Sequence, residues 1–341
     1  MNKKHLWGIL IVLAISSFVL YTDLKSTPFN EIIDAAKEMN WLAFSAIFLL
    51  MLFSFVCEAG ILATLAKRKD EPKHSKWSFF RIPIIQSLFN AITPMSTGGQ
   101  PSMLAAMVQM GIEGGRATSI LLMKFIIYQI VVFFAYIFTI VFGFHMVATK
   151  FAGLALFIVI GLLIHVCSTL FLLAIMFAYN WTKKATNWLM NLLAKFIKKE
   201  TVEKWRSATM EKIETFYAES QKLKKEKKKL IVASLLTLLQ LLCFYSVPFM
   251  VLQALNVHAS WLAVTQMNIM IIMFMAIIPI PGASGGAEYS FQTLFSTFVS
   301  SHGALILGMF LWRFATYFFG MILGIFGWIF KPKKIKEPQN D

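Results

Sequence analysis

The chain has 341 residues, of which 58% are hydrophobic and only 14% are charged, and its mean hydropathy is +0.68. A soluble domain is about one quarter charged, so this composition excludes a soluble protein and indicates an integral membrane protein. The formal net charge is +15. Because the cations gather in a few loops, we interpret them as determinants of orientation and of affinity for anionic lipid, and expect no nucleic-acid partner.

Apolar runs long enough to cross a hydrocarbon core of about 30 Å recur along the chain. They predict about six full spans, at about residues 6–21, 41–66, 116–144, 151–179, 230–252 and 303–330. The first run follows a basic N-terminus, as in a signal peptide. It lacks a small-residue cleavage site, so we interpret it as a retained span within one polytopic domain over residues 1–341.

The loops between these runs differ in charge. Residues 67–76 are dense in Lys and Arg, whereas residues 23–40 carry four acids against two lysines. Because Lys and Arg favour cytoplasmic loops, the sequence predicts a multi-pass protein with both termini in the cytoplasm. The segment 180–229 is also basic and contains interspersed tryptophans. It predicts an amphipathic cytoplasmic segment that contacts anionic lipid through 183–229, or a solvated basic helix that only sets orientation.

One motif occurs twice. Residues Pro94-Met-Ser-Thr-Gly98-Gly99 recur with the same spacing as Pro281-Gly-Ala-Ser-Gly285-Gly286. Each copy interrupts an apolar region whose two arms are too short to cross a bilayer, which predicts a re-entrant hairpin. The charge pattern places the first hairpin on the cytoplasmic side and the second outside. The sequence therefore predicts an all-α membrane protein built from two inverted repeats, 41–144 and 230–330.

A cation and a tyrosine follow each copy of the motif. Lys124 precedes Tyr128, and Arg313 precedes Tyr317, by four residues in both halves. Both cations lie about 12–15 Å into a span, where a charge costs several kcal/mol unless it is paired or hydrated. The helix N-termini that follow the Gly-Gly turns present free N–H groups, which suit a phosphate. The alternatives are that the glycines only allow close packing and that Lys124 reaches the interface.

Two acids lie within the apolar regions near these cations. Glu58 can pair with Lys124, and Glu288 with Arg313, either as structural ion pairs or in proton coupling. The predicted substrate-binding residues are Gly98, Gly99, Gln100, Lys124, Tyr128, Gly285, Gly286, Glu288, Arg313 and Tyr317, with Glu58 as a charge partner. The sequence contains no G-x-S-x-G, no H-E-x-x-H and no nucleotide-binding P-loop motif. We therefore expect no catalytic residue, metal or cofactor. The three cysteines lie in apolar runs and predict no disulfide framework.

Three stretches together resemble the lysylphosphatidylglycerol synthetase transmembrane-region family, the flippase-like membrane domain of the multiple peptide resistance factor. They are Thr93-Pro-Met-Ser-Thr-Gly-Gly-Gln-Pro101, Pro279-Ile-Pro-Gly-Ala-Ser-Gly-Gly-Ala-Glu288 and Leu311-Trp-Arg-Phe-Ala-Thr-Tyr317. The resemblance covers nearly the whole chain. It implies a bacterial plasma-membrane protein that moves lysylphosphatidylglycerol, or another phospholipid or lipid-linked anion, between leaflets.

The resemblance also raises an enzymatic alternative. In bifunctional relatives a soluble C-terminal domain transfers lysine from lysyl-tRNA to phosphatidylglycerol. We expect a stand-alone form without that domain, because the chain ends about eleven residues after its last span. A phosphatidylglycerol lysyltransferase and a small-solute or ion transporter on the same scaffold stay as alternatives, and a homo-oligomer is compatible with the sequence.

Overall fold

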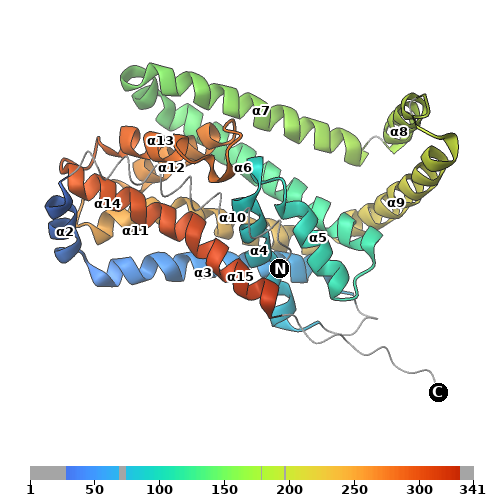
Figure 1. The fold of residues 1–341 in the computed structure, drawn as a ribbon, viewed down its shortest axis with the longest axis horizontal. Coiled ribbons are helices and arrows are strands. Elements are labelled where there is room, and N and C mark those ends of the chain that lie inside the picture. The colour runs from blue at the N-terminus through green and yellow to red at the C-terminus, as the bar shows by residue number, and fades with distance from the viewer. Residues whose placement is uncertain (1–27, 69–73, 178, 196, 331–341) are drawn as a thin grey trace.

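The structure is a computed structural model that describes residues 28–68, 74–177, 179–195 and 197–330 (Figure 1). Every regular element within these ranges is helical, which confirms the all-α membrane class. The predicted first span at about residues 6–21 lies outside the described residues, as do both chain ends.

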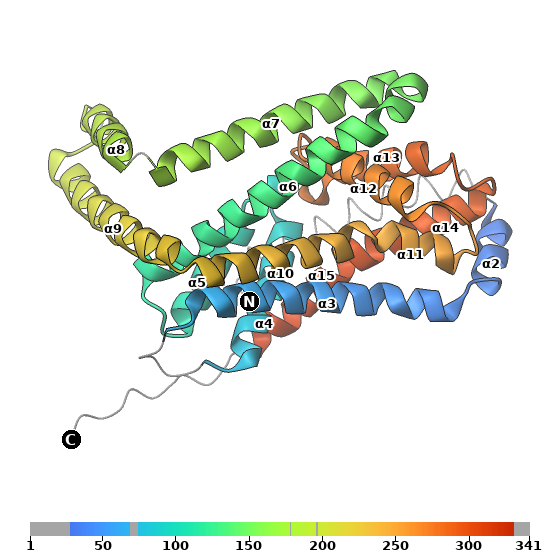
Figure 2. The ribbon, with the colours of Figure 1, turned by 180° about the vertical axis from the view of Figure 1, so that it is seen from behind.

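Five helical segments are long and apolar enough to cross a membrane. They agree with the second to sixth predicted spans and run side by side along the long axis of the molecule (Figures 1 and 2). They are α3 (Trp41–Ala66), most of α6 (Gly114–Lys150), most of α7 (Ala152–Phe177), α10 (Lys227–Tyr245) with α11 (Val247–Ala254), and α14 (His302–Arg313) with η3 (Phe314–Phe318) and α15 (Phe319–Ile329).

Two of these spans contain a break that the hydropathy pattern does not show. The fifth predicted span divides at Ser246, two residues before Pro248 in the first turn of α11. Proline has no N–H to continue a helix, so it favours the start of a new one. The last span changes to a π-helical segment, η3, immediately after Arg313. Such segments are short and often lie at functional positions.

Both motif regions form helical hairpins. In the first, α4 (Lys76–Ile92) and α5 (Gly99–Gln109) flank the turn η1 (Pro94–Ser96). In the second, α12 (Trp261–Met275) and α13 (Gly286–Phe295) flank the turn η2 (Pro281–Ala283). At 1.5 Å per residue, the longest of these helices reaches about 26 Å, which is less than a hydrocarbon core of about 30 Å.

The hairpins approach from opposite ends of the molecule. In Figure 1, α4 and α5 occupy the right half and α12 and α13 the left half, and η1 contacts η2 between them. Hairpins that enter from opposite ends and meet at their turns are the inverted arrangement that the repeated motif predicts. The boundaries of the two repeat halves stay a prediction.

The two ends of the molecule carry opposite charge. The short helix α2 (Phe29–Lys37), which carries Glu31 and Asp34, packs against α14 at the left end of Figure 1. The basic helices α8 (Tyr179–Leu193) and α9 (Lys199–Lys225) lie at the right end, and α9 contacts α6 and α10. This separation is the one that the positive-inside rule uses, although the membrane side of each end stays a prediction.

A surface ion pair joins the two basic helices. Lys183 of α8 donates a hydrogen bond to the Glu214 carboxylate of α9 at 2.6 Å, and this bond raises the pKa of Lys183. Trp181 and Trp188 of α8 are exposed. An exposed aromatic surface beside lysines is typical of a helix in the membrane interface.

The C-terminal half of the last span packs closely against the first hairpin. At Gly324 of α15, a Cβ atom would lie only 2.3 Å from the carbonyl oxygen of Ile84 in α4. Only glycine permits this distance between the two backbones. The close packing makes α15 a neighbour of hairpin one, whereas α14 contacts α13 of hairpin two.

Candidate functional site

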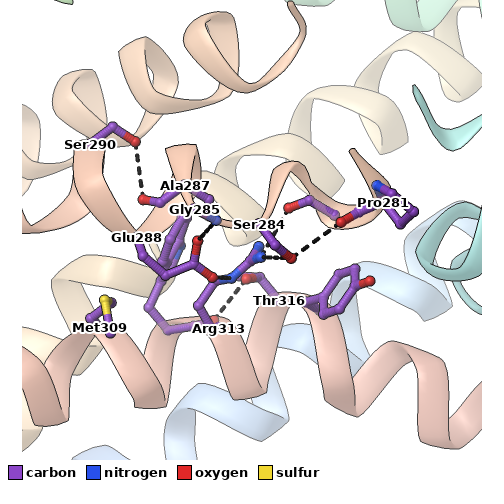
Figure 3. Close-up of polar contacts among 12 residues, drawn as sticks. Pro281, Ser284, Gly285, Ala287, Glu288, Ser290, Met309, Arg313 and Thr316 are labelled. Atoms are coloured by element: carbon purple, nitrogen blue, oxygen red, sulfur yellow. Dashed lines mark hydrogen bonds and ion pairs between the residues drawn. The ribbon is translucent and has the colours of Figure 1, made fainter. Parts of the chain in front are cut away.

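Arg313 connects the last span to the turn of the second hairpin (Figure 3). Its guanidinium is almost fully buried, and Nε donates to Oε1 of Glu288 at 2.7 Å. A terminal nitrogen donates to the Gly282 carbonyl at 2.9 Å and to the Ser284 hydroxyl at 3.4 Å. A charge near mid-membrane is tolerated when it is paired in this way. The structure thus contains the ion pair that the sequence suggests.

Glu288 has a second role, at the start of α13. Its other carboxylate oxygen accepts the Gly285 N–H at 2.7 Å, which is the half of a capping box that a glycine N-cap allows. Gly285 has a φ of +88°, a conformation that favours glycine. This N–H is therefore already occupied, so the expectation that it is free for a phosphate requires correction. A ligand at this terminus would compete with Glu288.

Lys124 forms a second buried ion pair. Its Nζ donates to the Glu58 carboxylate and to Oε1 of Gln86, the latter at 3.3 Å. The other carboxylate oxygen of Glu58 accepts from Nε2 of Gln240 at 3.0 Å. Lys124 and Glu58 are 7% and 8% exposed. Lys124 therefore does not extend to the interface, and the alternative that it snorkels is wrong.

The two ion pairs form separate centres. Arg313 contacts hairpin two, whereas Lys124 contacts α3 of the second predicted span and α4 of hairpin one. Their hydrogen-bonding partners do not overlap. Each cation is already neutralised by a carboxylate, so a phosphate can bind to either one only if it displaces or shares that carboxylate.

The turn of the first hairpin differs from the second in its exposure. Residues 94–97 are exposed, and Met95 and Ser96 have positive φ angles of 50° and 55°. Such a conformation costs a residue other than glycine about 1–3 kcal/mol and is often retained at functional sites. A turn at membrane depth needs protein or water around its polar groups. The exposed backbone of this turn is therefore a candidate contact for a polar group.

The glycines of this turn allow its backbone to pack closely against the end of α4. The Gly98 N–H donates to the Thr93 hydroxyl at 2.9 Å. Gly99 is buried against Asn90, and a Cβ atom there would lie 1.9 Å from the amide oxygen of Asn90. Gln100 is exposed on the first turn of α5. The structure therefore does not bring Gln100 to either ion pair.

Tyr317 bridges the two hairpins. Its hydroxyl donates to the Ala91 carbonyl at the end of α4 at 2.8 Å. A Cβ atom on Gly282 would lie 2.5 Å from its ring, and the Arg313 guanidinium is 4.9 Å from the ring centroid. Tyr128, its counterpart in the first half, is half-buried and packs against the apolar core instead. The symmetry of the motif does not extend to the tyrosines.

Several site residues are absent from the sequence prediction. Ser284 lies inside the second copy of the repeated motif and Thr93 directly precedes the first copy, so their position was a usable signal. Gln86 and Gln240 were not identifiable, because a single amide in an apolar helix usually only joins neighbouring helices. Their role depends on α3, α4 and α10 packing around the same carboxylate.

Comparison with known proteins identifies the family. The family model described as the lysylphosphatidylglycerol synthase TM region matches residues 6–324. This chain belongs to that family. The match includes the predicted first span and both hairpins. It confirms the resemblance that the motif sequences indicate and supports a multi-pass membrane protein of this class.

An archaeal protein is also similar to this family member. It is named UPF0104 membrane protein and comes from Archaeoglobus fulgidus. The two are 29% identical over 331 residues, which cover 92% of this chain and 94% of the relative. The similarity therefore extends over most of the chain, including both motif copies.

Proposed function

We propose that this protein is a phospholipid translocase, which moves lysylphosphatidylglycerol or another phospholipid or lipid-linked anion between the leaflets of a plasma membrane. One observation carries the proposal: the exposed turn η1 contacts η2 midway between the ends of the molecule. Exposed polar backbone at that depth is stable beside a polar group, and a lipid headgroup in passage is such a group.

The surface of α6 and α7 suits the acyl chains of a lipid. Large apolar side chains are exposed along both α6 and α7, and among them are Phe134, Phe142, Leu156, Leu163 and Leu170. Contiguous apolar surface on a membrane helix is compatible with lipid. In this proposal the headgroup passes the turns while the acyl chains stay in the bilayer beside these helices.

The headgroup phosphate would bind at the ion pairs. Arg313 offers a rigid fork of donors, which suits bidentate contact with a phosphate. Glu288 offers a matched negative charge, which suits an ammonium group on the same headgroup. Lys124 and Glu58 present the same two charges in the other half. The proposed binding residues are therefore the two pairs together with the Gly-Gly turns and Tyr317.

The last span provides a mechanism for access from both sides. Its N-terminal half is tied to hairpin two through Arg313, and its C-terminal half packs on hairpin one at Gly324. The π-helical segment η3 lies between the two halves. Rocking one hairpin against the other would bend this segment and strain the Tyr317 bridge. We expect such motion to open the centre to each leaflet in turn.

Lipid exchange in vesicles tests the proposal. The full chain would be reconstituted in phosphatidylcholine vesicles that contain phosphatidylglycerol labelled on an acyl chain, and dithionite would quench the label in the outer leaflet. We expect the wild type to make the inner label accessible. Arg313→Ala should abolish this exchange with expression unchanged, whereas Gly153→Ala, which meets open space, should not.

Two outcomes would contradict the proposal. Normal exchange by Arg313→Ala would exclude Arg313 from the site. Absence of exchange by the wild type with phosphatidylglycerol, phosphatidylethanolamine and lysylphosphatidylglycerol would exclude a translocase of these lipids. In that case, formation of lysyl-lipid from lysyl-tRNA and phosphatidylglycerol would favour the transferase alternative.

A further inference from the structure

The two buried ion pairs differ in chemistry although the motif repeats. The Glu288 carboxylate is compensated by three features: the Arg313 guanidinium, the Gly285 N–H and the positive end of α13. Two of these three features stay in place if Arg313 turns to another anion.

Glu58 lacks these features. It lies inside α3, where the backbone N–H groups are used by the helix itself. Its carboxylate is held by the Lys124 ammonium and the Gln240 amide. If Lys124 turns to another anion, Glu58 keeps only the Gln240 amide, whereas Glu288 keeps the Gly285 N–H and the positive end of α13 when Arg313 does the same. Of the two carboxylates, Glu58 therefore gains more from taking up a proton.

The groups around Glu58 come from four packed elements. α6 contributes Lys124, and α4 and α5 contribute the amide of Gln86 and the sulfur of Met103, both of which contact Lys124. α10 contributes the amide of Gln240, which donates to Glu58. Lys124 is thus the single cation that faces this carboxylate among the described residues.

Charge balance connects this difference to transport. When a headgroup phosphate binds Lys124, the Glu58 carboxylate loses its counter-ion while still buried. An unpaired buried carboxylate costs several kcal/mol, and uptake of a proton removes that cost. The proton binds a carboxylate oxygen, Lys124 keeps its charge and pairs with the phosphate, and release of the lipid reverses both steps. One proton is then carried with each negatively charged headgroup.

Buried tyrosines lie on α6 and α10, the two helices that pack against α3 beside Glu58. Tyr136 of α6 and Tyr245 of α10 belong to one buried core, and Tyr128 of α6 packs against it. Tyr245 is 3% exposed, and its hydroxyl has no hydrogen-bond partner within the described part of the chain. A buried unpartnered hydroxyl costs about 1–3 kcal/mol, so this position favours a mobile partner such as water, which can carry a proton.

His165 of the neighbouring helix α7 lies beside Tyr136. The ring centroids of Tyr136 and His165 are 4.8 Å apart, and Nε2 of His165 lies 3.3 Å from the Gln129 carbonyl. Histidine is the side chain best suited to exchange protons near neutral pH. Tyrosines of α6 and α10 and an imidazole of α7 thus lie in the same part of the helix bundle.

We propose that Glu58 is the proton-binding site that couples headgroup movement to a proton gradient, and that the hydroxyl of Tyr245 belongs to the route by which the proton reaches it. The inference rests on the proposed translocase function. It assigns different roles to two pairs that the repeat makes look equivalent: Lys124–Glu58 exchanges a proton, and Arg313–Glu288 holds a fixed charge.

The test imposes a pH gradient on the vesicle assay. The reconstituted full chain would receive a trace of acyl-labelled phosphatidylglycerol, and the leaflet distribution of the label would be measured with and without a gradient of one pH unit. One proton per lipid corresponds to a steady-state bias of up to about tenfold, since one pH unit is equivalent to 1.36 kcal/mol. We expect the wild type to develop this bias and Glu58→Gln to lose it.

Two further variants separate site from route. Tyr245→Phe should approach the same biased distribution several-fold more slowly, because it removes only the hydroxyl. Glu38→Gln removes an exposed carboxylate of the opposite end and should keep the wild-type bias. Retention of the bias by Glu58→Gln would overturn the assignment of Glu58, and an unchanged rate in Tyr245→Phe would overturn the route.

Failure of the coupling is distinguishable from failure of the function. Wild-type exchange that is equal with and without the gradient would refute the coupling and leave the translocase intact. Absence of wild-type exchange under both conditions would refute the function itself. If Glu58→Gln fails to reconstitute, proton entry into wild-type vesicles, followed with an internal pH dye, decides the question. Label movement without proton movement would overturn the proposal.

Discussion

The Arg313–Glu288 pair offers a way to separate structural from functional charge. Arg313→Met removes the guanidinium and leaves the Glu288 carboxylate buried at 4% exposure. Glu288→Gln removes the negative charge and keeps an oxygen that can accept the Gly285 N–H. The double variant removes both charges while it keeps similar side-chain volume. Together with the wild type, these three variants form a double-mutant cycle.

The expected energies follow from the contacts. Arg313→Met removes the hydrogen bonds to Glu288, Gly282 and Ser284 and leaves a buried carboxylate without its cation. Removal of one partner of a buried pair costs about 3–5 kcal/mol, whereas replacing both partners with groups of similar volume is often neutral. We expect the lower end for Arg313→Met, because the Gly285 N–H still holds Glu288, and we expect the double variant to recover most of the loss.

Stability and transport are predicted to diverge in this cycle. Thermal unfolding in detergent, followed by size-exclusion chromatography, would report stability, and the vesicle assay would report lipid exchange. The double variant should be nearly as stable as the wild type and still inactive, because a phosphate needs the guanidinium. Wild-type exchange by the double variant would show that the pair is purely structural. A double variant no more stable than Arg313→Met would refute the assigned coupling energy.

Two further predictions concern packing and the bridge between the hairpins. Gly324→Ala places a Cβ atom 2.3 Å from a backbone oxygen of α4, and it should lower the free energy of unfolding by at least about 1–3 kcal/mol. The control Gly153→Ala places its Cβ atom in open space and should leave stability unchanged. Equal losses in the two variants would contradict the close packing. Tyr317→Phe removes the hydroxyl that donates to hairpin one. It should lower stability by about 0.5–1.5 kcal/mol and speed lipid exchange, because a bond that holds this state is lost; an unchanged rate would argue against the bridge as a restraint.

Much of the architecture follows from the sequence alone. Five of the predicted spans correspond to described helices, and both hairpins were located by a Pro and Gly-Gly motif. These features are local: a helix must be long and apolar enough for the bilayer, and backbone that leaves a helix needs proline or glycine. Such requirements are properties of a single segment, so they can be predicted without knowing which other helices that segment contacts.

The tertiary structure decided how the charges are used. Glu58 and Lys124 are 66 positions apart, and Tyr317 and Ala91 are 226 apart. Which of these groups meet depends on which helix faces pack together, and hydropathy carries no information on that choice. For the same reason the repeated letters do not reveal that Glu288 caps its own helix while Glu58 has only side-chain partners. The sequence determined which segments can cross the membrane, and packing determined which buried charges pair with each other.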